Sequence, residues 1–559
     1  MKLRQISIRN YKGIKELDFS INETFICLIG VGDSGKSTLI DAIELVFTSR
    51  RSVEFDDSDF FNLDISTPIL ITATVTYLPP EFFSESKYGG YLRGWDGNNI
   101  IDEPNNQIET ALTIQLKVDK TLEPTWKIIN DRNPEGKDIS SYDRDKFNFA
   151  KIGFKSDWQF TLSKGSLLTR LISNTEQDIN SYLNDLARET KDNFEKNDLS
   201  SLKNSFNTIT AESKELAVPI ESFEPKLDIK SVNINSSGIS LHNKNIPIRN
   251  LGLGSKRLLS IVLQKKIFSS NYTILIDEIE HGLEPHRIIR LLKQLKTNNP
   301  GQVIISTHSP VPLCELSIDE LFVMNNVENK AKIINVNSKI SVEASNLLQK
   351  TIRNEPSSFL AKKIIVCEGK TEIGILRAFE ELAIKKGNNP FAYNGVALMN
   401  GNGSESSNIA VKMSELGYQV SLFCDSDVEL IPTTEELIEK RINIFQWSDN
   451  YNIEQRILLD IPNETIKKIL EFFVEMIGEE SMKSIFSINF DTNEIPRFLL
   501  TPFNTEQKLK LAEIINDKDL IKNISNAEAI GNIIFSDYDL LDKRTDFIAK
   551  LEQILSWIK

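Results

Sequence analysis

Hydrophobic and polar positions along the first 80 residues follow two repeats, one of period two and one of about 3.6. Alternation predicts strands over KLRQISIRN and ELDFSI, and an apolar run predicts a buried strand at FICLIG. Apolar residues three and four apart predict a helix over STLIDAIELVF, and the β-branched run TPILITATVTYL predicts another strand. The beginning of the chain therefore indicates an α/β domain.

The pattern changes twice over the next 140 residues. From about residue 81 to 150 the chain is rich in Gly, Asn, Asp and Pro, and strands are expected at IETALTIQLKV and TWKIIN, which indicates an irregular β insertion. Residues 165 to 218 are polar but carry apolar residues three and four apart, as amphipathic helices do. Such helices form either an arm through which two chains dimerise or a solvated helical lobe, and the pattern leaves both open.

Strand patterns return after this helical segment, at KLDIKSVNI, GISLHN, YTILIDE and QVIISTH. A second α/β pattern follows a helix-prone linker, with KKIIVCEG, VALMNG and VSLFCDSD as its strands, and from about residue 455 the chain is mostly helical. We therefore expect a first α/β domain in two parts, residues 1–164 and 221–340, with a helical insertion at 165–220 between them. A linker at 341–361 and a second α/β domain at 362–559 follow.

Composition and charge fit an ordinary soluble protein of several domains. A chain of 559 residues is too long for one hydrophobic core, so we expect about three or four domains. The sequence has no apolar run of about 18 residues, and its N-terminus alternates like a strand where a secretory signal would need an apolar block. We expect a cytoplasmic protein with no membrane partner. The net charge of −14 argues against a chain that coats nucleic acid through its overall field, but it leaves room for a local basic channel.

A phosphate-binding loop lies between the strand FICLIG and the helix that follows it. Residues 30–37, GVGDSGKS, fit the pattern GxxxxGK[ST] in its usual strand-loop-helix context. Backbone amides and the helix N-terminus would cradle the phosphates, Lys36 would reach the outer phosphates, and Ser37 would ligate magnesium. The nucleotide-binding residues predicted here are Gly30, Gly32, Asp33, Ser34, Gly35, Lys36, Ser37 and Thr38.

Two later strand ends supply the rest of an ATP-hydrolysing site. The strand YTILIDE offers Asp277, which would hold the magnesium through water, and Glu278, which would polarise the attacking water. His308 closes the next strand and fits a γ-phosphate sensor. The alternative is a solvated acidic pair and a structural histidine, but the apolar run before the pair favours the catalytic interpretation.

These elements together resemble the ABC-type ATPase head of the SMC, RecF and Rad50 group. The stretch NLGLGSKR, residues 250–257, precedes a helix and resembles the signature loop of that group, which implies that Gly252, Gly254 and Ser255 face a nucleotide on a second head. Two differences stand out, because Lys256 occupies the usual place of a glutamine and Glu284 precedes Pro285 where a histidine is usual. The resemblance implies that two heads pair to complete each nucleotide site.

Acidic residues gather again in the second α/β pattern. Glu368 follows the strand IIVC, and Glu372 lies one helical turn further along. Asp425 and Asp427 end the strand VSLFC, and alternate side chains of an extended segment point the same way. Because ligands of parallel sheets bind at the carboxyl ends of the strands, we expect these four carboxylates to converge there. Oxygen-only ligation suits Mg²⁺ or Mn²⁺ better than Zn²⁺.

Two further candidates lie downstream of these carboxylates. Glu454 would bind a second ion, and its alternative is an exposed carboxylate at the start of a helix. Lys543 precedes a helix and would stabilise charge on the cleaved phosphate, with Arg544 beside it as a rival. A lysine on a solvated face is the alternative interpretation of Lys543.

The order EGKTE, a glycine turn at residues 401–403, and DSD resembles the Toprim fold of topoisomerases, primases and a class of nucleases. An ABC-type head followed by a Toprim module resembles the OLD (overcoming lysogenization defect) nuclease family over nearly the whole chain. The resemblance implies an α/β architecture, with an inserted helical dimerisation arm in the head and C-terminal helices after the parallel Toprim sheet. It also implies ATP and Mg²⁺ or Mn²⁺ as cofactors, DNA as the substrate, and a role in defence against bacteriophage.

The resemblance to the OLD family also implies residue roles and partners. The catalytic residues it implies are Glu278, His308, Glu368, Asp425, Asp427 and Lys543. The metal ligands are Ser37, Asp277, Glu368, Glu372, Asp425, Asp427 and Glu454. Related chains act alone, beside a helicase in Gabija systems, or as effectors of retrons with their reverse transcriptase and noncoding RNA. We expect at least a homodimer, with a tetramer as the larger alternative.

Two-metal hydrolysis of a phosphodiester is the hypothesis for the second site, with one ion near Glu368 and Asp425 and another near Glu454 and Asp427. A topoisomerase is disfavoured, because the surroundings of the downstream tyrosines do not indicate a covalent nucleophile. Two alternatives stay open: a RecF-like or SMC-like DNA-binding ATPase with an inactive Toprim module, and an ATP-sensing scaffold that holds a separate effector.

Overall fold

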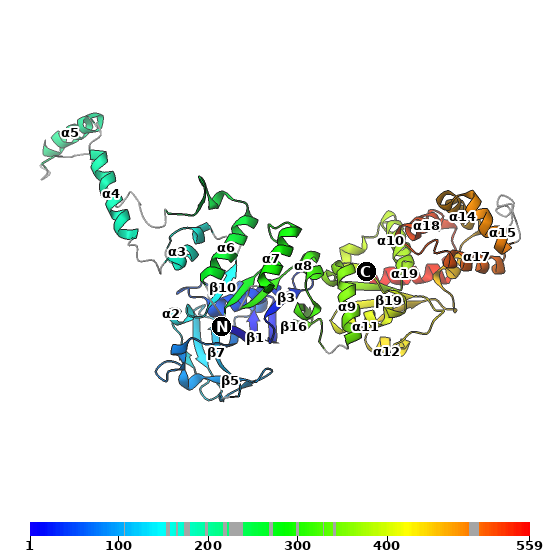
Figure 1. The fold of residues 1–559 in the computed structure, drawn as a ribbon, viewed down its shortest axis with the longest axis horizontal. Helices are drawn as coiled ribbons and strands as arrows, with labels where there is room; N and C mark the ends of the chain where they lie inside the picture. The colour runs from blue at the N-terminus through cyan, green and yellow to red at the C-terminus, as the bar shows by residue number, and fades with distance from the viewer. Residues whose placement is uncertain are drawn as a thin grey trace.

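The computed structural model contains two α/β regions side by side, with the N-terminus in one and the C-terminus in the other (Figure 1). The structure describes residues 1–105, 107–152, 157–163, 166–172, 179–195, 200–215, 221–222, 239–267, 272–297, 301–327, 329–338, 342–490 and 502–559. We call residues 1–338 the N-terminal region and residues 363–559 the C-terminal region.

The nucleotide-site half of the N-terminal sheet is parallel. Its strands have the order β10-β13-β14-β3-β15, and each is paired in parallel with the next. The strands are continuous apolar runs, as expected where both faces of a parallel sheet are covered. They are β10 (Phe149–Ile152), β13 (Thr273–Ile276), β14 (Gln302–Ser306), β3 (Phe25–Ile29) and β15 (Leu321–Val327).

The same sheet continues into a mainly antiparallel half. Its further order is β16-β2-β1-β4-β7-β5-β6, with β8 on β7 and β9 on β8. The stretch from 81 to 150, expected to be an irregular β insertion, contributes the strands from β5 to β9 to this sheet. The strands are β16 (Lys330–Asn335), β2 (Ile14–Ser20), β1 (Lys2–Tyr11), β4 (Ile69–Thr76), β7 (Glu109–Val118), β5 (Arg93–Trp95), β6 (Ile100–Ile101), β8 (Pro124–Ile129) and β9 (Lys137–Asp138).

Helices cover both faces of the parallel half. Helix α1 (Lys36–Phe47) buries Leu39, Ile43 and other residues three and four apart in a core with β1 and β4. On the other face, α7 (Pro285–Thr297) buries Ile288 and Leu292 against the parallel strands, beside α8 (Pro310–Glu315). Helix α6 (Leu253–Ile267) lies in the same layer (Figure 1). The strands and helix predicted in the first 80 residues, and those predicted at YTILIDE and QVIISTH, are thus found within an α/β fold.

The inserted segment contains α3 (Leu167–Ile172), α4 (Ile179–Glu195) and α5 (Ser200–Glu215). Helices α4 and α5 extend away from the rest of the N-terminal region (Figure 1). The strand expected at KLDIKSVNI, residues 226–234, lies outside the described residues, and GISLHN ends in β11 (His242–Asn243), which pairs with β12 (Ile246–Pro247). Dimerisation through this segment stays a prediction.

The segment expected to be a linker, residues 341–361, is described from residue 342 onward, and that part contributes to an apolar core. It forms α9 (Val342–Asn354) and the short helix η9 (Pro356–Leu360). Leu348, Ile352 and Phe359 are fully buried in a core that also contains strand residues of both α/β regions. The two regions therefore share one hydrophobic core.

The C-terminal region is built on a four-stranded parallel sheet of order β18-β17-β19-β20. On one side of this sheet, helix α10 (Lys370–Lys385) lies close to helix α18 (Ile524–Ser536). Gly374 permits this contact, because an added Cβ there would lie 2.5 Å from Ala527 Cβ. The strands are β17 (Lys363–Cys367), β18 (Val396–Asn400), β19 (Gln419–Cys424) and β20 (Asn443–Gln446). The helices described are α10 (Lys370–Lys385), α11 (Ser406–Glu415), α12 (Thr434–Glu439), α13 (Ile453–Asp460), α14 (Asn463–Ile477), α15 (Glu479–Phe490), α17 (Thr505–Asp517), α18 (Ile524–Ser536) and α19 (Asp546–Ile558). Among the described residues, no helix combines the length and the apolar character needed to cross a membrane.

Candidate functional site

The predicted phosphate loop connects β3 to α1, and its backbone needs glycine. Gly30 and Gly35 have φ angles of 129° and 100°, a region that favours glycine. A Cβ at Gly30 would also lie 2.5 Å from the carbonyl oxygen of Met324 on β15. The loop is thus tightly seated against the neighbouring strand.

Lys36 lies buried under this loop. Its ammonium donates hydrogen bonds to the carbonyl oxygens of Gly30 and Val31, at 2.9 and 2.8 Å, and to Ser34 Oγ at 3.1 Å. Burial lowers the pKa of Lys36 to about 8. Because phosphate oxygens are stronger partners for an ammonium than carbonyl groups are, the side chain is ready to exchange these bonds for a nucleotide.

The predicted magnesium ligands meet directly at the ends of β13 and β14. Ser37 Oγ donates to Asp277 Oδ1 at 3.2 Å, and Ser306 Oγ donates to the same oxygen. The backbone N–H of Glu278 donates to Ser306 Oγ at 2.8 Å, and Glu278 has a φ of 46°. Ser306 was not among the predicted residues, although its place at the end of QVIIS was the available signal.

Glu280 is a second residue that the sequence pattern did not single out. Its two carboxylate oxygens accept hydrogen bonds from the N–H of His308 and from Thr307 Oγ1, each at 2.7 Å. It therefore holds the loop that carries the predicted γ-phosphate sensor, whose side chain is exposed. An acidic residue two positions after Glu278 was the signal that could have identified it.

The loop that resembles an ABC signature precedes α6 and is partly exposed. Leu253 is 55% exposed and Gly252 is exposed, whereas Gly254 packs so closely that a Cβ there would lie 2.0 Å from the carbonyl oxygen of Gly282. The buried Arg257 donates to the carbonyl oxygens of Asp277 and His281. This loop is thereby fastened to the end of β13 that carries the predicted ATPase acids.

A cavity of about 430 Å³ lies at the carboxyl edge of the C-terminal sheet. It collects all five predicted carboxylates of the second site, since Glu368 follows β17, Asp425 and Asp427 follow β19, and the other two lie in the first turns of α10 and α13. Its lining is Glu368, Gly369, Lys370, Thr371, Glu372, Asn400, Asn402, Gly403, Asp425, Asp427, Asn452, Ile453, Glu454, Asn516 and Lys522.

Burial and mutual repulsion raise the pKa of most of these carboxylates. Burial, with the charges of Glu368 and Glu454, raises the pKa of Glu372 to about 8. Burial, followed by the charges of Glu372 and Glu368, raises the pKa of Asp425 to about 10. The pKa values of Glu368 and Glu454 also rise, chiefly through burial. A bound cation would relieve this repulsion.

Three of the carboxylates already accept hydrogen bonds from nearby N–H groups. Glu368 Oε2 accepts from the N–H of Asp425 at 2.9 Å, Glu372 Oε2 from the N–H of Gly369 at 2.8 Å, and Asp425 Oδ1 from Trp447 Nε1 at 3.0 Å. Within the part of the chain that the structure describes, no group of three or more His, Cys, Asp and Glu side chains is arranged to hold a metal ion. The all-oxygen donor set and the charge repulsion nevertheless fit Mg²⁺ or Mn²⁺.

Two lysines line this cavity, Lys370 and Lys522. Burial raises the pKa of Glu454, and the charge of Lys522 acts against that rise. The predicted lysine lies elsewhere, because the described residues that line the cavity include neither Lys543 nor Arg544. The ammonium of Lys543 is 5.6 Å from the ring centroid of Tyr538. The structure thus brings Lys370 and Lys522, and not Lys543, to the predicted carboxylates.

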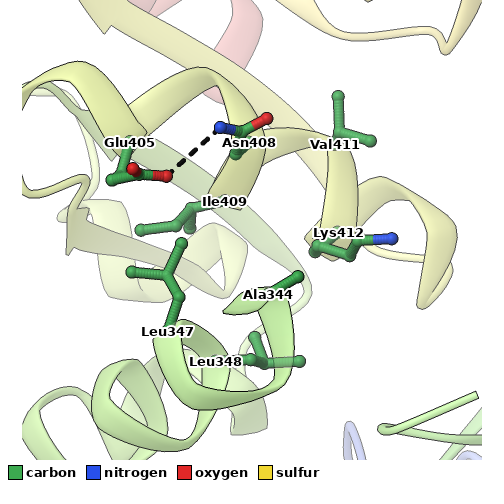
Figure 2. Close-up of a pocket in the computed structure, with 8 residues that line it drawn as sticks. All are labelled: Ala344, Leu347, Leu348, Glu405, Asn408, Ile409, Val411 and Lys412. Carbon is green, nitrogen blue, oxygen red and sulfur yellow. Dashed lines mark hydrogen bonds between the residues drawn. The ribbon is translucent and has the colours of Figure 1, made fainter. Parts of the chain in front are cut away.

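A second cavity, of about 360 Å³, lies where α9 meets α11. Figure 2 shows apolar side chains such as Leu347 and Ile409 facing one another there, with a hydrogen bond of 3.2 Å from Asn408 to Glu405 at its edge. This cavity contains no predicted catalytic residue.

Comparisons with known proteins agree with this geometry. A family model described as "AAA ATPase domain" matches residues 1–311, and one described as "Overcoming lysogenization defect protein-like, TOPRIM domain" matches residues 359–427. The retron Vc95 probable ATPase of Vibrio cholerae serotype O1 biovar El Tor is 22% identical over 396 residues, which cover 60% of this chain and 76% of that protein.

Two solved SMC heads are also similar. The SmcHead bound to the C-winged helix domain of ScpA aligns with 14% identity and a TM-score of 0.35, over 62% of this chain and 100% of that chain. The SMC head domain from Thermotoga maritima aligns with 16% identity and a TM-score of 0.29, over 61% of this chain and 100% of that chain.

The two family models follow one another along the chain in the order that the sequence predicted, an ATPase and then a Toprim domain. The first of them covers more than half of the 559 residues. The protein therefore belongs to the AAA ATPase domain family, and it is an ATPase and nuclease in which an OLD-like Toprim domain follows the ATPase head.

Proposed function

We propose that the protein is an ATP-hydrolysing, divalent-metal-dependent DNA endonuclease that acts in antiphage defence. The observation that carries the proposal is the cavity at the carboxyl edge of the Toprim sheet, where five carboxylates and two lysines, Lys370 and Lys522, line one space of about 430 Å³. Such a set of oxygen ligands beside a cationic side chain suits a phosphodiester, which is anionic and reacts through bound divalent ions.

The Toprim residues divide into two groups in this proposal. Glu368 and Asp425 would hold one ion, and Glu454 and Asp427 would hold another, with Glu372 beside both groups. A divalent cation bound there would supply Lewis-acid stabilisation of the phosphate and lower the pKa of a water. Lys522 offers a mobile positive charge at the rim, since its side chain is 47% exposed and its ion pair with Asp519 is a surface contact.

The head residues bind and hydrolyse ATP in the proposal. Lys36 and the loop amides bind the phosphates, Ser37 and Asp277 hold Mg²⁺, and Glu278 polarises the attacking water. Glu280 sets the position of His308 through the hydrogen bond to its backbone. ATP turnover then gates or tunes cleavage by the Toprim domain.

The partners in this proposal follow from the head and from the relatives. Paired heads place the exposed signature loop of one chain against the nucleotide of a second, so the working unit is at least a dimer. The relative's name, a retron Vc95 probable ATPase, supports a retron setting with a reverse transcriptase and noncoding RNA, rather than a Gabija helicase.

A plasmid-nicking assay on the purified protein tests the proposed nuclease. We expect the wild type to cut plasmid DNA in Mg²⁺ or Mn²⁺ and to stop when EDTA removes the metal. Asp425→Asn keeps the side-chain volume but removes a charge that a cation requires, so we expect cleavage to fall at least 100-fold while ATP hydrolysis stays within about 2-fold. Unimpaired cutting by this variant would remove the proposed site.

A second candidate function is an ATP-sensing scaffold that holds a separate effector. The observation that favours it is the absence, among the described residues, of three side chains arranged to hold a metal ion. A wild-type protein that hydrolyses ATP and oligomerises but leaves DNA intact in every divalent metal would support the scaffold and exclude the nuclease.

A further inference from the structure

Trp447 lies directly behind one of the proposed metal ligands. It follows the last residue of β20, and its indole Nε1–H donates to Asp425 Oδ1 at 3.0 Å. The side chain is almost fully buried, with 3% of its surface exposed. Because an indole has one donor and no acceptor, Trp447 can only donate in this bond, and the oxygen of Asp425 that it holds is Oδ1.

Packing fixes the direction of this donor. The ring of Phe423, two residues before Asp425 on β19, meets the indole edge to face, with centroids 5.3 Å apart and planes at 79°. The ring of Phe547 at the start of α19 lies 6.1 Å away on another side. A buried ring between two aromatic neighbours has few rotamers, so the N–H points at one place.

The backbone around Trp447 is anchored on both sides. Gln446 Nε2 donates to the carbonyl oxygen of Asp425 at 2.7 Å. Ser448 donates through its N–H and its hydroxyl to the carboxylate of Asp546, at 2.6 and 2.9 Å. The end of β20 is therefore held between β19 and the N-terminus of α19, and it carries the indole with it.

The chemistry of the donor matters as much as its position. Asp425 faces the negative charges of Glu372, Glu368 and Glu454. A positively charged side chain in the place of the indole would compete with a metal cation for the carboxylate of Asp425. The indole N–H is neutral, so it orients the carboxylate and leaves its charge to a metal ion. Neighbours of this kind tune metal affinity in proteins, and their loss commonly weakens it 10- to 100-fold.

We infer that Trp447 is a positioning residue for Asp425 and sets the affinity of the Toprim cavity for divalent cations. The inference rests on the proposed nuclease. Trp447 touches neither substrate nor cation, and its effect passes through the orientation of one carboxylate.

The test is Mn²⁺ binding to the full chain without DNA or nucleotide, measured by electron paramagnetic resonance of free Mn²⁺. The sites that disappear in Asp425→Asn define the Toprim component. Trp447→Phe keeps an aromatic ring and removes the N–H, so we expect the Kd of that component to rise about 10- to 100-fold. Saturating Mn²⁺ should then restore most of the cleavage, with ATP hydrolysis unchanged. Trp557→Phe, a partly buried tryptophan of the same domain on α19, is the matched control and should keep the wild-type Kd.

The possible outcomes distinguish a failure of the role inferred for Trp447 from a failure of the proposed nuclease. Equal Mn²⁺ affinity in the wild type and Trp447→Phe overturns the inference and leaves the nuclease standing. A wild type without any component that depends on Asp425 overturns the proposed metal site itself. If circular dichroism shows that Trp447→Phe does not fold, Phe547→Leu is the second variant, because it removes one of the rings packed against the indole. We expect it to raise the Kd for Mn²⁺ about 3-fold. An unchanged Kd in Phe547→Leu overturns the inference.

Discussion

We expect substitution of Lys522 and of Lys543 to have different effects on DNA cleavage, because of these two lysines only Lys522 lines the acidic cavity. Lys522 lies beside Glu454 and reaches it from the turn before α18, whereas Lys543 is stacked near Tyr538. A positive group that stabilises charge at the reacting phosphate is worth about 10²- to 10³-fold in kcat. We expect Lys522→Ala to lower the cleavage rate by that factor and Lys543→Ala to cut at the wild-type rate.

The measurement is the single-turnover rate of plasmid nicking at saturating metal, with ATP hydrolysis as the control for an intact head. A strong loss in Lys543→Ala with a normal Lys522→Ala would reverse the assignment and restore the lysine that the sequence pattern favoured.

The acids of this site were predictable from sequence, and Lys522 was not. Glu368 and Asp425 each follow a strand of a parallel sheet, and the carboxyl ends of such strands meet at one edge. Lys522 arrives there because the helix that follows it, α18, packs against α10, and no pattern in the sequence specifies that contact. Trp447 was hidden for a similar reason, since an aromatic residue after a strand is usually just part of a core.

At the level of elements, the contact of α10 with α18 is what presents Glu372 to the cavity. The two helices approach closely at Gly374, where an added Cβ would lie 2.5 Å from Ala527 Cβ and 2.6 Å from the carbonyl oxygen of Ile524. Backbone cannot yield as a flexible side chain can, so a larger residue must push the helices apart. Gly374 lies two residues after Glu372, and the shift would reach the carboxylate.

We therefore expect Gly374→Val to destabilise the Toprim domain by about 1–3 kcal/mol and to reduce cleavage more than ATP hydrolysis. Differential scanning calorimetry and the two activity assays measure these effects. Glu381→Val, at an exposed position of α10, carries the β-branched cost alone and should change stability by about 0.5 kcal/mol. Equal effects of both substitutions would show that the helix contact is not critical.

Most elements followed from periodicity, but their packing did not. Many strands of both sheets, such as β3, β14, β17 and β19, and helices α1 and α10 coincide with apolar repeats in the sequence, whereas β10, β15, β16 and β20 were not predicted. The polar stretch from 341 to 361 had the pattern of a helical linker, and yet three of its apolar residues, Leu348, Ile352 and Phe359, are fully buried. A sequence repeat reports which face of a helix is apolar, but it does not report what covers that face.

On the scale of the whole molecule, β15 contacts the phosphate loop and also the turn that leads into β19. The carbonyl oxygen of Met324 lies against Gly30 of the phosphate loop. The next residue, Asn325, donates a hydrogen bond from Nδ2 to the carbonyl oxygen of Leu416 at 2.5 Å. Leu416 belongs to the turn between α11 and β19, and β19 ends at Asp425. The shared apolar core surrounds this connection. A movement of the phosphate loop on ATP binding can therefore reach the strand that carries the proposed metal ligands.

Asn325→Leu should weaken this connection and leave both sites intact. The substitution preserves the side-chain shape but leaves the Leu416 carbonyl without its donor. Single changes of this kind alter coupling between sites by about 0.5–2 kcal/mol, so the ratio of cleavage rates with and without ATP should move toward one by roughly 2- to 30-fold. ATP hydrolysis and ATP-free cleavage should stay near wild type. Asn326→Leu, whose amide donates to the carbonyl oxygen of Gly13 within the head, is the matched control.

Amide hydrogen exchange measures the same coupling between the phosphate loop and β19 directly. In the wild type, ATP should slow amide exchange in β19 as well as in the phosphate loop, because a ligand bound to one part of a cooperative unit protects the rest of it. In Asn325→Leu the protection should remain in the phosphate loop and fall in β19. Protection confined to the N-terminal region in the wild type would mean that the common core does not transmit nucleotide binding, and the ATP dependence of cleavage would then have to arise through the pairing of two chains.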